Sequence, residues 1–97
     1  MIIIGNRRNY DHGEYVGRPT PLGNPYPLND ESDRDDMCDY YESWFIQQII
    51  EQNPLIVAEL KRLQALHRMY KSLTLICWCA PKRCHAETIK KWLEANP

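Results

Sequence analysis

Apolar residues recur with helical spacing along residues 35–52 of the chain. The intervals between them are three and four residues, which places them on one face of an α-helix. Ser32 precedes this segment as a candidate N-cap, and aspartates fill the first turn, where the helix dipole favours negative charge. The pattern predicts an amphipathic helix of about 20 residues, whose buried face carries Met37, Tyr41, Trp44, Phe45 and Ile49.

Two later segments have the same period. Asn53 and Pro54 supply a cap and a first-turn proline, so a second helix is predicted from Pro54 to about Lys71. Its apolar positions are Leu55, Ile56, Leu60, Leu63, Leu66 and Tyr70. A third helix is predicted from Cys84 onward, with Ala86, Ile89, Trp92 and Leu93 facing inward.

Short apolar runs outside these segments are typical of strands. Residues 1–4 (MIII) predict a buried strand that ends at the turn formers Gly5 and Asn6. Residues 15–17 (YVG) are a weaker strand candidate, and residues 72–77 (SLTLIC) predict the central strand. Residues 17–30 hold four prolines and two glycines in fourteen positions, a density that excludes helix and central strand. They form a long loop, and such loops are often functional.

This order of elements predicts one α/β domain over residues 1–97, with a small sheet of three or so mainly parallel strands packed with three helices. The last strand follows two helices, so it is expected to run parallel to the first through a crossover, in two or three layers. Ligands of such sheets bind outside the carboxyl ends of the strands. The proline-rich loop and the segment 77–85 (CWCAPKRCH) are therefore expected to share one edge.

Composition narrows the class of protein. Hydrophobic residues are 43% and charged residues 26% of the 97 residues, an ordinary globular balance. The net charge of −1 makes nucleic acid an unlikely partner, because phosphate binding needs a basic face. No apolar run is long enough to span a membrane or to form a signal-peptide core, so a cytoplasmic protein with reduced thiols is predicted.

The segment 77–85 admits a metal site. Cys77, Cys79, Cys84 and His85 are ligand types that zinc takes. Adjacent Cys84 and His85 diverge by about 100° on a helix, so all four converge on one ion only with strain. A zinc-stabilised module is kept as an alternative, and no cofactor is favoured.

A reactive thiol is a second interpretation. Cys84 stands near a helix N-terminus behind Lys82 and Arg83, and amide dipoles and cations lower the pKa of a cysteine. Cys84 and His85 are therefore candidate catalytic residues, with Cys77 or Cys79 as a resolving partner.

A cradle for an anion is the interpretation that we favour. Lys82, Arg83 and the free amides of the following helix suit a phosphate group. The facing loop offers Arg18, Gly23 and Asn24: a guanidinium, a glycine that permits close backbone approach, and an amide for a base or ribose edge. The aromatic residues Tyr26 and Trp78 are candidates for stacking on a ring, with Cys79 beside them.

The motifs of both segments resemble a known family. Gly17-Arg18 and 22–26 (LGNPY), followed by Cys77, Trp78, Cys79, Pro81, Cys84 and His85, are similar to the pattern of the domain of unknown function 4326, found in short proteins of bacteria and their phages. Arg34 resembles that family's helix-start arginine. The resemblance implies a small Rossmann-like fold and no particular reaction.

The sequence therefore predicts a domain that binds a small phosphorylated ligand, such as a nucleotide or an ADP-ribose-like compound. If the protein is an enzyme, a hydrolase or transferase acting on nucleotide-derived substrates is expected. A phage-encoded protein that binds a host protein is the other alternative, and a homodimer is plausible because so small a core gains from further burial.

Overall fold

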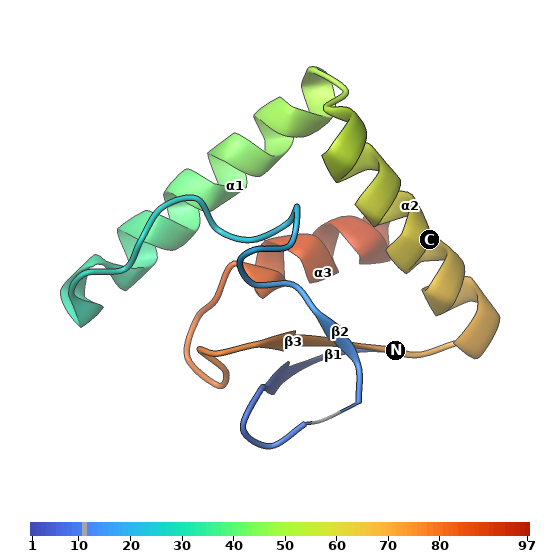
Figure 1. Cartoon of the computed structure of the whole chain (residues 1–97), viewed down its shortest axis with the longest axis horizontal. Helices are drawn as coiled ribbons and strands as arrows, with labels where there is room; N and C mark the ends of the chain where they lie inside the picture. The colour runs from blue at the N-terminus through green and yellow to red at the C-terminus, as the bar shows by residue number, and fades with distance from the viewer. Residues whose placement is uncertain (11) are drawn as a thin grey trace.

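The computed structural model describes residues 1–10 and 12–97. Within these residues lie three strands, a short 3-10 turn η1 and three α-helices, so the predicted small α/β fold is confirmed (Figure 1). The bounds are β1 Ile2–Asn6, β2 Glu14–Tyr15, η1 Glu31–Asp33, α1 Arg34–Ile50, α2 Pro54–Tyr70, β3 Leu73–Cys77 and α3 Ala86–Ala95. Residues 7–14 are mostly polar, which predicts a loop between the first two strands. Residue 11 of this stretch lies outside the described residues.

The sheet has the order β1-β3-β2, and both outer strands run parallel to β3. Ile2 pairs with Leu73 and Asn6 with Cys77, while Tyr15 pairs with Ile76. The prediction that residues 72–77 form the central strand is therefore confirmed. The expectation that Gly5 and Asn6 end the first strand is wrong, because pairing with β3 carries β1 through both residues.

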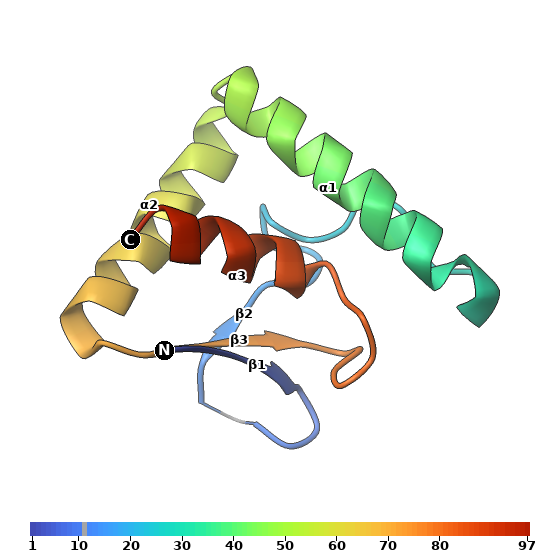
Figure 2. The ribbon, with the colours of Figure 1, turned by 180° about the vertical axis from the view of Figure 1, so that it is seen from behind.

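All three helices cover one face of the sheet, so the fold has two layers (Figures 1 and 2). Helix α3 packs on β1 and β3, while α1 and α2 meet at an angle outside it. On the opposite face, the Tyr10 ring lies against Gly5. There Gly13 has φ +143° and lies against Ile76, where a Cβ atom would come within 2.9 Å of the Ile76 side chain.

The helix caps agree with the prediction at the start of α2 and differ from it at the start of α1. Asn53 accepts a hydrogen bond from the Leu55 amide at 3.1 Å and Pro54 opens α2, as predicted. Before α1, the cap is Asp30 rather than Ser32: the Ser32 amide donates to Asp30 Oδ1 at 2.9 Å and starts η1. Helix α1 consequently begins at Arg34 and has 17 residues.

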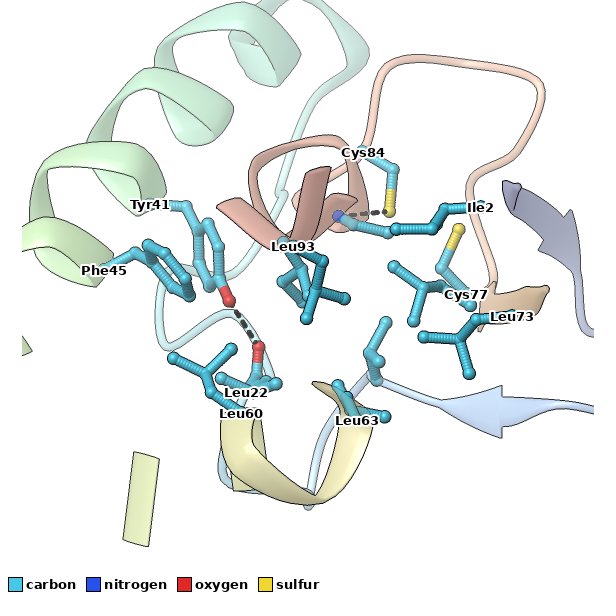
Figure 3. Close-up of a cluster of buried hydrophobic side chains, with 14 of the residues drawn as sticks. Ile2, Leu22, Tyr41, Phe45, Leu60, Leu63, Leu73, Cys77, Cys84 and Leu93 are labelled. Atoms are coloured by element: carbon cyan, nitrogen blue, oxygen red, sulfur yellow. Dashed lines mark hydrogen bonds between the residues drawn. The ribbon is translucent and has the colours of Figure 1, made fainter. Parts of the chain in front are cut away.

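The core fills the space between the sheet and the helices (Figure 3). Every element except β2 and η1 contributes to it, and the loop after β2 adds Val16 and Leu22, which are 1% and 0% exposed. Burying a side chain such as Leu22 stabilises a fold by about 1.5–3 kcal/mol. The proline-rich loop is thus anchored in the core. Among the described residues, no helix combines the length and apolarity needed to cross a membrane.

Candidate functional site

A cleft of about 320 Å³ opens beyond the carboxyl ends of β2 and β3. It lies between the proline-rich loop, the start of α1 and the loop joining β3 to α3. Eight residues singled out from the sequence line it: Arg18, Asn24, Tyr26, Trp78, Cys79, Arg83, Cys84 and His85. The remaining walls come from Tyr15, Gly17, Leu28, Arg34, Met37 and Cys38. The two segments that were expected to share one edge therefore do lie side by side.

Two of the expected ligand-binding residues do not line this cleft. The missing side chain of Gly23 makes room for the backbone of Arg18, since a Cβ atom would lie 2.7 Å from the Arg18 amide nitrogen. The close approach that Gly23 permits is thus within its own loop and not to a ligand. Lys82 points away, with its ammonium group 3.5 Å from Glu31 on the surface.

Three buried contacts hold the loops together. His85 immediately precedes α3, and its Nε2 lies 2.8 Å from the carbonyl oxygen of Val16 at the end of β2. The edge of the His85 ring packs against the ring of Tyr41, with centroids 5.0 Å apart. The Tyr41 hydroxyl in turn donates to the Leu22 carbonyl at 2.7 Å (Figure 3). One chain of contacts therefore joins α3, α1 and the proline-rich loop.

The end of β1 shapes the loop after β3. Asn6 donates through Nδ2 to the carbonyl oxygens of Trp78, at 3.0 Å, and Ala80, at 2.8 Å. The Arg7 amide donates to the Cys77 carbonyl at 2.8 Å. The peptide bonds before Pro19 and Pro81 are cis. Trp78 is 56% exposed beside the cleft, and its Nε1 donates to the Tyr15 hydroxyl at 3.2 Å.

The contact with Val16 fixes the proton on His85. A carbonyl oxygen only accepts, so Nε2 must carry the hydrogen, and a neutral ring then leaves a lone pair on Nδ1. That nitrogen faces the sulfur of Cys84 at 3.3 Å. Burial lowers the pKa of His85, which favours the neutral ring. The thiol of Cys84 is accordingly the donor and Nδ1 the acceptor.

The pKa values of the thiols do not fit the expectation that Cys84 is the one that ionises. The pKa of Cys84 is raised by the neighbouring sulfurs of Cys77 and Cys79 and by burial. The pKa of Cys79 is lowered by the Cys84 thiol and by the guanidinium of Arg34. Cys79 is half-buried on the cleft wall, whereas Cys84 is 3% exposed. The pKa of Cys77 is lowered as well, to about 6, but its side chain is only 1% exposed. Of Cys79 and Cys84, which both line the cleft, Cys79 favours the thiolate and Cys84 favours the thiol.

Acidic residues at the start of α1 neutralise most of the cations. Arg83 pairs with Asp35 at 3.0 Å and with Asp39 at 2.8 Å. Arg34 makes a two-pronged contact with Glu31 and so lowers the pKa of Glu31 to about 2. The run 30–36, which reads in the sequence as solvated cap chemistry, thus supplies counter-charges to the loop 78–85.

Arg18 and the amides of α3 complete the charge pattern. Arg18 lines the cleft, and within the described chain no carboxylate forms an ion pair with it. The first amides of α3 already have partners: the Cys84 amide donates to Glu87 at 3.1 Å, and the Ala86 amide to the Cys84 sulfur at 3.5 Å. An anion in the cleft would therefore be held by Arg18 rather than by the predicted cradle at Lys82 and Arg83.

Two residues of the site are not apparent from residue types alone. Arg34 reaches from the start of α1 to Cys79 and donates to the carbonyl oxygen of Arg83 at 2.9 Å. Its one signal in the sequence is the match to the family's helix-start arginine. Tyr15 carries no signal of its own, because its role as a wall of the cleft depends on the pairing of β2 with β3.

The zinc alternative gains no support from the geometry. Among the described residues, no group of three or more His, Cys, Asp or Glu side chains is arranged to hold a metal ion.

Comparison with known proteins gives one match. A family model described as a domain of unknown function (DUF4326) matches residues 4–95. No curated protein and no solved structure matches the chain. The match spans almost every element of the fold and both segments that line the cleft, so the chain belongs to this family.

Proposed function

We propose that this member of the domain of unknown function 4326 family binds a small ligand that combines a phosphate group with an aromatic ring, as a nucleoside monophosphate does. One observation carries the proposal: a guanidinium without an acidic partner among the described residues and exposed aromatic rings line the same cleft. The guanidinium belongs to Arg18 and the exposed rings to Trp78 and Tyr26.

The charge of the cleft selects the anion. Arg83 and Arg34 are committed to carboxylates, so Arg18 is the side chain that gains most from an added phosphate. A guanidinium binds phosphate through two parallel N–H groups, and such charge-assisted bonds each contribute about 1.5–3 kcal/mol. Asn24 commits its Oδ1 to the Tyr26 amide at 2.8 Å, so its amide hydrogens remain to meet an acceptor on the ligand.

The aromatic residues suit the ring of such a ligand. Trp78 is 56% exposed and Tyr26 is 37% exposed, so both rings are accessible to a ligand in the cleft. Stacking of one base on an aromatic side chain contributes about 1–3 kcal/mol. The bond from Trp78 to Tyr15 fixes the indole at the wall, which lowers the entropy cost of stacking.

The size of the cleft favours the smaller of the expected ligands. Ligand pockets span roughly 300–1,000 Å³, and this one, at about 320 Å³, lies at the lower end. A single nucleoside monophosphate or a sugar phosphate suits this volume better than an ADP-ribose-like compound.

Thermal-shift measurements test the proposal. The common ribonucleoside monophosphates are compared with the matching nucleosides, ADP-ribose and inorganic phosphate. We expect the melting temperature to rise most with a monophosphate, because a ligand at about 100 times its Kd stabilises the native state by about 2.7 kcal/mol. No shift with any compound would overturn the proposal.

A pair of variants locates the binding site. Arg18→Gln should weaken binding by about 10- to 100-fold, since it removes the charge-assisted bonds to phosphate. Arg8→Gln is the matched control, because Arg8 is exposed and lies outside the cleft. Equal affinities of the two variants in isothermal titration would place the anion elsewhere.

A further inference from the structure

The loop after β3 gathers three sulfur atoms that the proposed ligand does not use. Cys77 ends β3, Cys79 follows in the turn, and Cys84 stands just before α3. Cys79 and Cys84 both line the cleft, whereas Cys77 does not. All four cysteines of the chain are free thiols. Cys79 and Cys84 lie in one short loop and share one cleft, so a disulfide between them would involve this loop alone.

The three thiols differ in access. Cys77 is 1% exposed, and Cys84 is 3% exposed although it lines the cleft, whereas Cys79 on the cleft wall is partly exposed. The guanidinium of Arg34 lies beside Cys79 and favours negative charge on its sulfur. A small reagent that enters the cleft therefore meets Cys79 first, and it meets it in a cationic setting that suits a thiolate.

We propose that Cys79 is a site of oxidation by peroxides and that Cys84 resolves the oxidised sulfur into an internal disulfide. This inference is independent of the ligand proposal, since it rests on the sulfur cluster and its access to solvent.

The chemistry balances in two steps with a hydroperoxide as the oxidant. The Cys79 thiolate attacks the nearer peroxide oxygen, the O–O bond breaks, and hydroxide leaves, so that sulfur becomes a sulfenic acid. The Cys84 sulfur then attacks the Cys79 sulfur and displaces the hydroxyl group as water. The proton lost by Cys84 passes through Nδ1 of His85, which lies 3.3 Å from the Cys84 sulfur, to the departing oxygen.

The resolving thiol is Cys84 rather than Cys77 for two reasons. Cys84, unlike Cys77, lines the same cleft as Cys79. It also has an acceptor for its proton, because the Val16 carbonyl holds the proton of His85 on Nε2 and leaves Nδ1 free. Attack by a buried thiol needs such an acceptor, since only the thiolate is nucleophilic.

Peptide mapping of the wild-type protein tests the inference without any variant. The reduced protein is treated with hydrogen peroxide, its remaining thiols are alkylated, and it is digested with trypsin. Cleavage after Lys82 and Arg83 separates a peptide of residues 72–82 from one of residues 84–90. We expect these two peptides to appear joined, with the bridge assigned to Cys79 by fragmentation. A bridge from Cys77, or oxidation of Cys38 at the same rate as Cys79, would overturn the proposal.

Variants test the order of the two steps. Cys84→Ser should stop the reaction at the sulfenic acid, which a 1,3-dicarbonyl reagent traps on Cys79. Cys38→Ser is the matched control: Cys38 is also buried, at 7% exposed, and its replacement should leave the disulfide unchanged. If Cys84→Ser does not fold, the time course of the wild-type map decides, because the sulfenic acid on Cys79 must appear before the bridge. A bridge that forms with no prior change at Cys79 would refute the mechanism.

Discussion

Replacing Tyr41 with phenylalanine removes one oxygen atom from the contact that joins α1 to the proline-rich loop. The Tyr41 side chain is 0% exposed, and its hydroxyl donates to the Leu22 carbonyl at 2.7 Å. The phenylalanine ring would keep the packing against His85 and Phe45, whose ring centroids lie 5.0 Å and 5.9 Å from that of Tyr41. Tyr41→Phe therefore tests the hydrogen bond separately from the packing.

The loss of stability depends on the Leu22 carbonyl, which the substitution leaves without a hydrogen-bond donor. A hydrogen bond in a folded protein contributes a net 0.5–1.5 kcal/mol, roughly, but a buried acceptor left without a donor costs about 1–3 kcal/mol. Leu22 is 0% exposed, so water does not replace the lost donor without opening the loop. We expect the free energy of unfolding to fall by about 2 kcal/mol.

Urea denaturation measures this change. For a domain of this length the slope m is about 1–1.5 kcal/mol per molar urea, so the midpoint should fall by about 1.3–2 M with m unchanged. Tyr40→Phe is the matched control on the same helix, because Tyr40 is 52% exposed and its ring packs against Tyr26 at 5.8 Å. Its unfolding free energy should change by less than about 0.5 kcal/mol.

Equal midpoints for the Tyr41 and Tyr40 variants would refute the reasoning. Such a result would mean that the Leu22 carbonyl finds another partner at little cost. The proline-rich loop would then not be anchored through Tyr41, and the position of the cleft wall would need a different cause.

Three other properties of the chain can be measured in the same way. Gly23→Ala should lower the unfolding free energy by about 1–3 kcal/mol, because its Cβ atom would lie 2.8 Å from the Arg18 Cα; an unchanged urea midpoint would argue against this packing. Burial lowers the pKa of His85, so below about pH 6.5 the unfolded chain binds a proton that the folded chain does not. The free energy of unfolding should therefore fall as the pH is lowered below that value, by up to about 1.4 kcal/mol per pH unit. His85→Asn should remove that part of the slope, and an identical slope in both proteins would contradict it. Iodoacetamide at pH 6 should label Cys79, whose pKa is lowered, more than about tenfold faster than Cys38, whose pKa is raised by burial; equal rates would speak against the thiolate.

Local patterns predict the elements because each pattern has a local cause. The period of apolar residues and the Asn53-Pro54 pair place α2 at Pro54–Tyr70, within one residue of the prediction. The errors arise where tertiary pairing decides. Gly5 and Asn6 are turn formers, yet hydrogen bonds to β3 hold them in a strand. Asp30 and Ser32 both suit an N-cap, and residue preference alone does not choose between them.

The position of the site follows from topology, but its charges do not. Parallel strands bring the loops at their carboxyl ends to one edge, so the meeting of Asn24 and His85 at one cleft can be inferred from the order of elements. The pairing of Arg83 with Asp39 joins residues 44 positions apart and depends on the angle of α1. The protonation of Cys84 likewise depends on the carbonyl of Val16, through the tautomer of His85, which no local motif encodes.

The buried contacts around the cleft stabilise the fold, whereas the exposed ion pairs set the charge of the cleft. The pairs that Arg83 makes with Asp35 and Asp39 lie at the surface, where such pairs contribute about 0–1 kcal/mol and are screened by salt. The contacts of His85 and Tyr41 are buried and insensitive to salt. Stability should therefore depend on the buried pair, whereas the charge presented to a ligand should depend on the surface pairs. High salt should then leave the urea midpoint nearly constant while it lowers the affinity for an anion. If the midpoint and the affinity fell together, the surface pairs would also stabilise the fold.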